Sequence, residues 1–181
     1  MSIVIRDEIT VKKDPQAIWH ILTDIAGWGR WTRVISHAAV YGPLMRGTEF
    51  KCIAGKWDFA CFIEQIETGR VFACRGKSIG LNLSVNWELT GDAISTRVRA
   101  SAEFSGWIVR LFGKQIGQSI KDSLFTWLYA LKTRAERGEQ KSDHSRQSGD
   151  LKQHFPRKVS LTNPFNALLR RSRRRRDDSD E

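Results

Sequence analysis

The sequence has few cysteines and lacks any long run of apolar residues. Its three cysteines, Cys52, Cys61 and Cys74, form no C-x-x-C pair, which argues against a zinc or redox motif, and we interpret them as buried, reduced thiols. No stretch approaches the roughly 18 apolar residues of a membrane-spanning helix, and the first residues lack the basic and apolar regions of a signal peptide. We therefore expect a cytoplasmic protein, peripheral to a membrane only if its C-terminal residues bind one.

Recognisable catalytic motifs are also absent. The chain contains no G-x-S-x-G, H-E-x-x-H, phosphate-binding loop or dinucleotide-binding fingerprint, so we expect no catalytic residue, metal or cofactor that the sequence could name. We interpret His20 and His37 as structural or solvated. The charged residues that lie in expected strands are the acid–base candidates Glu64, Arg75, Glu88 and Arg97. Enzymatic activity stays open, because a cyclase that acts by desolvating and folding its substrate needs almost no motif.

Tryptophan, in contrast, is abundant and unevenly distributed. All seven tryptophans lie within residues 1–138, and none lies in residues 139–181. The second segment is polar and carries a run of arginines near its end, a composition typical of chains without a packed core. We predict a globular domain over residues 1–138 and a polar linker with a disordered, Arg-rich tail over residues 139–181.

Hydrophobic periodicity predicts strands through most of the domain. Apolar residues alternate with polar ones at 3–12, 34–41, 47–54, 57–66, 70–76, 81–89 and 94–104. In the last of these strands the residues expected to face inward are Ile94, Thr96, Val98, Ala100, Ala102 and Phe104. Between the first two strands, Asp14 and Pro15 are typical of a helix start and predict a helix over 15–22, and Asp24 begins a second short helical turn.

The longest predicted element is an amphipathic helix over residues 107–137. Its apolar residues recur every three or four positions and therefore share one face: Trp107, Ile108, Leu111, Phe112, Ile116, Ile120, Leu124, Trp127, Leu128 and Leu131. A straight helix of this length would measure about 45 Å, so we predict a bend at Gly113 or Gly117. The order of elements predicts an α+β fold in which a curved antiparallel sheet is covered by this helix, with space left between them.

Four segments carry a resemblance to a known family. DPQAIWHILTDIAGWGRW, VYGPLMRGTEF, SAEFSGW and LYALKTRAE resemble the START-like helix-grip superfamily, specifically its polyketide cyclase/dehydrase and lipid transport group. The resemblance covers residues 3–137. It implies a seven-stranded sheet gripping a C-terminal helix, two short helices between the first two strands, and an internal cavity for a lipid, sterol, quinone or polyketide. A minority of that family are aromatase/cyclases.

The candidate ligand-binding residues are the inward aromatic and aliphatic residues and two tryptophans near the short helices. They are Trp28, Trp31, Trp57, Phe59, Phe72, Trp87, Phe104, Leu111, Ile116, Gly117, Ile120 and Leu124. Periodicity does not distinguish a cavity wall from a solid core, so both interpretations stay open. Trp28 and Trp31, beside Gly27 and Gly29, fit either a mobile gate or a hydrophobic plug.

The tail carries a second candidate site. After Asn163-Pro164 a short amphipathic segment contains the apolar and basic residues expected to contact a membrane or a partner: Phe165, Leu168, Leu169, Arg170, Arg171, Arg173, Arg174, Arg175 and Arg176. An anionic membrane surface, a nucleic acid or acidic partner, and no partner at all remain alternatives. The leading hypothesis for the whole chain is a carrier of a hydrophobic small molecule. An aromatase/cyclase and an interaction module with a basic tail are the alternatives, and the oligomeric state stays open.

Overall fold

The computed structural model describes residues 2–137 of the chain. The elements are β1 (Ser2–Val11), α1 (Pro15–Thr23), the 3-10 turn η1 (Ile25–Gly27), α2 (Trp28–Trp31), β2 (Ile35–Val40), β3 (Glu49–Ala54), β4 (Trp57–Glu67), β5 (Val71–Ser78), β6 (Leu81–Gly91), β7 (Thr96–Ser105) and α3 (Trp107–Arg137). α1 begins as predicted, because Asp14 Oδ1 accepts a hydrogen bond from the Ala17 N–H at 2.9 Å and Pro15 occupies the first turn.

The seven strands form one antiparallel sheet in the order β1-β7-β6-β5-β4-β3-β2. Strands β2 to β7 follow one another as a meander, and β1 pairs with β7 from Ser2 opposite Ser105 to Val11 opposite Thr96. The predicted α+β fold, a sheet gripping a long C-terminal helix, is confirmed.

The start of β7 differs from the prediction. Asp92 Oδ1 accepts hydrogen bonds from the backbone N–H groups of Ile94 (2.8 Å) and Ser95 (3.0 Å), so both residues belong to the β6–β7 turn. Ile94, expected to face inward, is 79% exposed, and the strand begins at Thr96.

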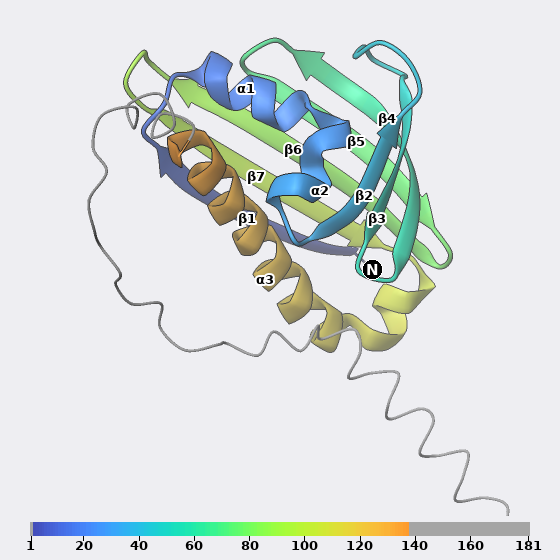
Figure 1. The fold of residues 1–181 in the computed structure, drawn as a ribbon. Coiled ribbons are helices and arrows are strands. Elements are labelled where there is room, and N and C mark those ends of the chain that lie inside the picture. The colour runs from blue at the N-terminus through green and yellow to red at the C-terminus, as the bar shows by residue number, and fades with distance from the viewer. Residues whose placement is uncertain (1, 138–181) are drawn as a thin grey trace, which may run out of the picture. The chain divides into compact units, whose positions relative to one another are not determined.

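The two ends of the sheet carry different parts of the covering helix. At the lower end in Figure 1 lie the first residue of β1, the β3–β4 and β5–β6 turns and the start of α3. At the upper end lie the start of α1, the β6–β7 turn and the end of α3. There the Lys12 N–H donates to Glu136 Oε1 (2.9 Å) and Lys132 Nζ donates to the Thr10 carbonyl (2.7 Å). These contacts fasten the C-terminal half of α3 to the end of β1.

The long helix α3 is bent near one of the two predicted points. Phe112 leaves helical geometry, with φ −125° and ψ 24°, immediately before Gly113. Gly117 instead lies against β1, where an added Cβ would be 3.8 Å from Ile3 Cδ1. The first turn of α3 lies beside the β5–β6 turn, since the Ile108 N–H donates to the Gly80 carbonyl, and the rest of the helix covers the concave face of the sheet (Figure 1). No helix within residues 2–137 is long and apolar enough to span a membrane.

Candidate ligand-binding site

The upper part of the interior is a closely packed aromatic cluster. The Trp28 ring meets the rings of Phe50, Phe72 and Trp127 edge-to-face, with centroids 5.8, 6.3 and 5.2 Å apart, and Trp127 meets Trp87 at 5.0 Å. All five side chains are at most 8% exposed. Edge-to-face pairs at these distances are favourable packing contacts, so this part of the domain is solid core.

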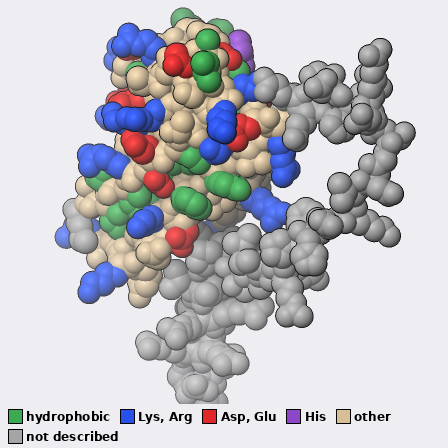
Figure 2. All heavy atoms as spheres, turned by 90° about the vertical axis from the view of Figure 1, so that its left-hand side faces the viewer, with side chains coloured by type: hydrophobic (Ala, Val, Ile, Leu, Met, Phe, Trp, Pro, Cys, Tyr) green, Lys and Arg blue, Asp and Glu red, His purple; other side chains and the backbone are tan. Residues whose placement is uncertain are grey.

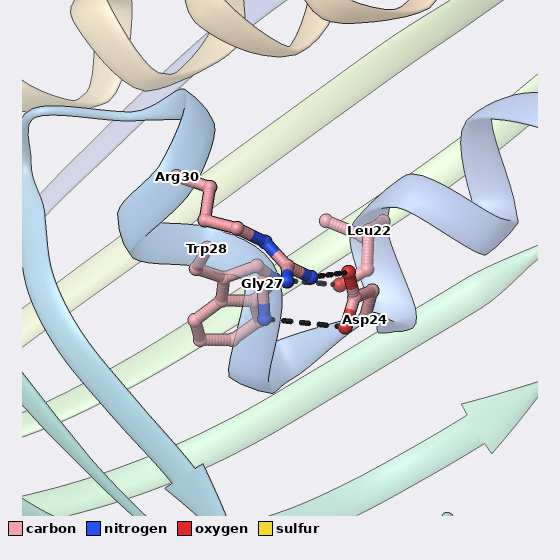
Figure 3. Close-up of polar contacts among 5 residues, drawn as sticks. All are labelled: Leu22, Asp24, Gly27, Trp28 and Arg30. Atoms are coloured by element: carbon pink, nitrogen blue, oxygen red, sulfur yellow. Dashed lines mark hydrogen bonds and ion pairs between the residues drawn. The ribbon is translucent and has the colours of Figure 1, made fainter.

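Trp28 is anchored rather than placed as a gate. Its indole Nε1 donates to the Leu22 carbonyl at 2.8 Å, and it is 1% exposed. Figure 3 also shows Asp24 at the turn between α1 and α2, where its carboxylate accepts hydrogen bonds from the Gly27 N–H and from the Arg30 guanidinium. An added Cβ on Gly27 would collide with that carboxylate.

Gly29, the other glycine of this turn, is required by close packing too. An added Cβ there would lie 2.9 Å from the Ser36 carbonyl oxygen, which is shorter than the contacts that Cβ atoms make in proteins. Gly27 therefore leaves room for the Asp24 carboxylate and Gly29 for the Ser36 backbone, and these contacts favour the plug interpretation of Trp28 over the gate.

Toward the lower end, the inward apolar residues of the sheet, of α2 and of the connection between α2 and β2 are only half-buried. They are Ile3, Ile5, Trp31, Val34, Ala54, Trp57, Leu83 and Phe104. Ile3, Phe104 and Leu83 are direct neighbours across β1, β7 and β6. Toward the opposite edge of the sheet, Ala54 of β3 pairs with both Trp57 of β4 and Ile35 of β2. These residues form an incompletely covered rim around the lower end of the concave face, which we call the lower rim.

α3 supplies the opposite wall. Ile116, Ile120 and Leu124 are 4–5% exposed and face the sheet, as predicted from their spacing. Leu111 does not lie with them, because it is 67% exposed. The non-helical backbone at Phe112 rotates the first turns relative to the rest of the helix, so the expected inward position of Leu111 is corrected.

The predicted ligand-binding residues are therefore divided among three environments. Trp28, Phe59, Phe72, Trp87, Ile116, Ile120 and Leu124 are buried; Trp31, Trp57, Phe104 and Gly117 are half-buried; Leu111 is exposed. Ile3, Ile5, Val34, Ala54 and Leu83 belong to the lower rim but were not named from the sequence. Ile3 and Leu83 do occupy inward positions of alternating strands, so the signal was present but did not set them apart from core residues.

Several buried polar atoms of the interior have no hydrogen-bond partner. They include the indole Nε1 atoms of Trp31 and Trp57 on the lower rim and Ser119 Oγ on α3. The Nε1 atoms of Trp87 and Trp127, inside the aromatic cluster, also lack an acceptor. A buried donor without an acceptor is costly by about 1–3 kcal/mol, so an oxygen atom brought close to Trp31, Trp57 or Ser119 would be stabilised there.

The three cysteines are all buried on the concave face. Cys52 and Cys61 have their sulfur atoms 4.0 Å apart. The contact with Cys52 and burial raise the pKa of the Cys61 thiol, and burial raises the pKa of the Cys74 thiol. Cys61 and Cys74 are therefore neutral thiols, which contribute to the apolar interior and are poor nucleophiles.

The acid–base candidates lie outside the interior. Arg75 Nε donates to Glu64 Oε2 at 2.8 Å in an ion pair on the outer face of the sheet. Glu64 lies at the register shift of β4, between Ile63 and Gln65, on the face opposite to the buried Ile63. Glu88, Arg97, His20 and His37 are exposed.

A separate open cleft of about 720 Å³ lies at the upper end of the sheet, between the start of α1 and the β4–β5 and β6–β7 turns. Its carboxylates are occupied by the chain itself, since Asp14 accepts from the Ala17 N–H and Asp92 from the Ile94 and Ser95 N–H groups. None of the predicted ligand-binding residues lines it. The predicted tail site, from Phe165 to Arg176, falls outside the described residues.

Comparison with known proteins places this geometry in a family. A comparison with curated protein sequences found no match. Among solved structures, the chain is similar to the Zhui aromatase/cyclase from a Streptomyces species (TM-score 0.65, 15% identity, 76% of this chain and 95% of that one). It is also similar to a START superfamily protein from Mycobacterium smegmatis (TM-score 0.65, 12% identity, 75% and 98%).

A third similar structure is norcoclaurine synthase from a Thalictrum species (TM-score 0.60, 11% identity, 77% of this chain and 97% of that one). At these identities the likeness concerns the fold. The family model described as polyketide cyclase/dehydrase and lipid transport matches residues 2–136. The chain therefore belongs to the polyketide cyclase/dehydrase and lipid transport family.

Proposed function

We propose that the domain binds and carries a hydrophobic small molecule of the lipid, quinone, sterol or polyketide class. The ligand lies between the lower rim and the inner face of α3. One observation carries the proposal: the interior is sealed by the aromatic cluster at its upper end, but its apolar residues are only half-buried at the lower end. Apolar side chains left partly in water gain free energy when a ligand covers them, by roughly 25 cal/mol per Å².

The unpartnered donors support a ligand with oxygen atoms. Trp31 and Trp57 present indole N–H groups, and Ser119 presents a hydroxyl, without acceptors in the protein. A carbonyl or hydroxyl oxygen would satisfy one of these donors, whereas a pure hydrocarbon would not. A ligand that covers about 300 Å² of apolar surface gains roughly 7 kcal/mol before association costs, which is consistent with micromolar affinity.

The first test is native mass spectrometry of the full chain purified from its own host. A co-purified lipid, quinone or polyketide would support the proposal and identify the ligand class. The second test titrates the protein with a fluorescent hydrophobic probe such as 8-anilinonaphthalene-1-sulfonate. Failure of both, with no co-purified molecule and no probe binding, would contradict the proposal.

A matched pair of variants locates the site. Leu83→Trp places a large side chain on the lower rim and should weaken probe binding about tenfold or more, since it occupies the space proposed for the ligand. Asn82→Trp adds the same side chain to the neighbouring exposed position on the other face of β6 and should leave binding unchanged. Equal effects of the two variants would place the site elsewhere.

An aromatase/cyclase is the second candidate, favoured by the similarity in fold to the Zhui aromatase/cyclase. Asp7 on β1 is a half-buried carboxylate on the same face of the strand as Ile3 and Ile5 of the lower rim. It is the residue through which acid–base chemistry on the concave face would act. Loss of product formation in Asp7→Asn, with probe binding retained, would favour the enzyme over the carrier.

We also propose, from its sequence alone, that the Arg-rich tail binds an anionic membrane surface or a nucleic acid. Deleting residues 161–181 and measuring co-sedimentation with anionic vesicles and with nucleic acid would test it. Unchanged binding in both assays would mean that the tail contributes to neither membrane binding nor nucleic-acid binding.

A further inference from the structure

A group of large apolar side chains is exposed beside the lower end of the sheet. Ile79 in the β5–β6 turn is 85% exposed, and on α3 Trp107 is 55%, Leu111 67% and Phe112 43% exposed. We call these four residues the end patch. Soluble proteins seldom gather exposed apolar side chains of this size without a partner.

The end patch is held by a fixed backbone. The Ile108 N–H donates to the Gly80 carbonyl at 3.3 Å, which joins the start of α3 to the β5–β6 turn. The Trp107 indole lies over Gly80, where an added Cβ would be 2.6 Å from its Cε2 atom. Val109, between the exposed residues, is fully buried. The exposure is therefore built into the packing and does not come from a frayed helix end.

The charged residues nearest to the end patch along the chain are basic. Arg110, Lys114 and Lys77 are all exposed, and residues 104–121 contain no Asp or Glu. The positive end of the helix dipole favours acidic residues in the first turn, yet the first turn of α3 contains none. Cations at this position weaken the helix by themselves, so their presence favours an anionic partner.

Other parts of the surface differ from this arrangement. On the face drawn in Figure 2, acidic and basic side chains lie next to one another with hydrophobic ones between them. On the outer face of α3 itself, Phe125 and Tyr129 are each 58% exposed, but they stack on each other (6.4 Å between centroids, 17° between planes) close to the acidic Asp122. These two residues provide an internal comparison.

We propose that the end patch docks the domain on an anionic phospholipid surface. Trp107, Leu111, Phe112 and Ile79 would enter the interface between head groups and acyl chains, where tryptophan is preferred. Arg110, Lys114 and Lys77 would lie against the lipid phosphates. A second copy of the chain fits less well, because it would bring the same cations together. The inference does not rest on ligand binding, although docking would set the lower rim beside the membrane.

The test is co-sedimentation of the full chain with vesicles of phosphatidylcholine mixed with phosphatidylserine. The chain should bind these vesicles and should bind pure phosphatidylcholine vesicles much less. Its binding to the mixed vesicles should weaken with added salt. Trp107→Ala combined with Leu111→Ser should lower the partition coefficient by about tenfold or more. Arg110→Gln combined with Lys114→Gln should lower it by about fivefold for each charge removed. Because the tail is present in every variant, its contribution is constant.

Two controls separate docking from general effects. Phe125→Ser combined with Tyr129→Ser removes equally exposed aromatic side chains from the same helix and should bind as the wild type does. Leu111→Ser alone, which keeps Trp107 over Gly80, should still weaken binding and should leave the circular dichroism spectrum unchanged. Trp107 is the exposed one of the seven tryptophans, so vesicles should shield it from acrylamide, an effect absent in Trp107→Phe.

The proposal is overturned if the end-patch double variant binds vesicles as tightly as the wild type, since the tail would then account for binding. It is also overturned if the wild type binds no anionic vesicles. Sedimentation of the wild type without vesicles, abolished by Leu111→Ser, would assign the patch to self-association instead. If the chain binds anionic vesicles through the end patch but binds no hydrophobic ligand or probe, the proposed function is contradicted and the docking proposal stands.

Discussion

Replacing Trp28 by alanine separates the two interpretations of this residue. Its ring contacts those of Phe50, Phe72 and Trp127, and each such pair contributes about 0.5–1.5 kcal/mol beyond its buried area. The indole hydrogen bond to the Leu22 carbonyl (2.8 Å) adds about 1 kcal/mol. Truncation of a buried tryptophan typically costs about 3–5 kcal/mol, and we expect a loss in that range. The total free energy of unfolding of a domain of this size is about 5–15 kcal/mol, so the variant should still fold at low temperature.

Urea unfolding followed by far-UV circular dichroism measures this loss. Trp31→Ala is the matched control: Trp31 is half-buried and its Nε1 atom has no acceptor, so it should cost only about 1–2 kcal/mol. The order should reverse in probe binding, which Trp31→Ala should weaken more than Trp28→Ala does. A Trp28→Ala variant that loses less than about 1 kcal/mol yet no longer binds the probe would refute the core assignment and restore the gate.

Three further predictions concern the framework around the site. Gly106→Ala should lower stability by about 1–3 kcal/mol in thermal unfolding, because Gly106 has φ +124° and an added Cβ would collide with the Gly80 carbonyl oxygen; an unchanged melting temperature would contradict the geometry of this junction. Since burial raises the pKa of Cys74 in the folded state, the contribution of this thiol to stability is fully present below its ordinary pKa of 9.0 and should be lost above it by up to about 1.4 kcal/mol per pH unit; under reducing conditions Cys74→Ala should show a smaller fall. The backbone hydrogen bonds at the start of α1 lower the pKa of Asp14 below 3.8, so Asp14→Ala should lower the melting temperature at neutral pH, and the difference from the wild type should vanish as the pH falls below 3.8.

The sequence was most informative where structure depends on neighbours along the chain. Asp14 and Pro15 predicted the start of α1 because an N-cap acts within one turn. Alternation from Leu81 to Leu89 predicted the inward face of β6, because successive side chains of a strand point to opposite faces. The β6–β7 turn was the exception, since Asp92 takes Ile94 out of the strand by a side-chain hydrogen bond that alternation does not represent.

The candidate site was only partly predictable for the same reason. Leu83 and Trp87 occupy equivalent inward positions of one strand, but Trp87 is sealed beneath Trp127 whereas Leu83 is half-buried. What covers each residue comes from α3, which is distant in sequence. Leu111 fitted the periodic stripe of that helix and became exposed because the backbone breaks at Phe112.

The sequence by itself therefore determined the elements, their order, the family and most of the inward faces, with Ile94 and Leu111 as exceptions. The tertiary structure decided which inward residues are sealed core, which form the lower rim, and which apolar residues of α3 are exposed as the end patch. The physical reason is that periodicity fixes the direction of a side chain relative to its own helix or strand. Burial depends on whether another element lies opposite it, and the bend at Phe112 sets where α3 covers the sheet.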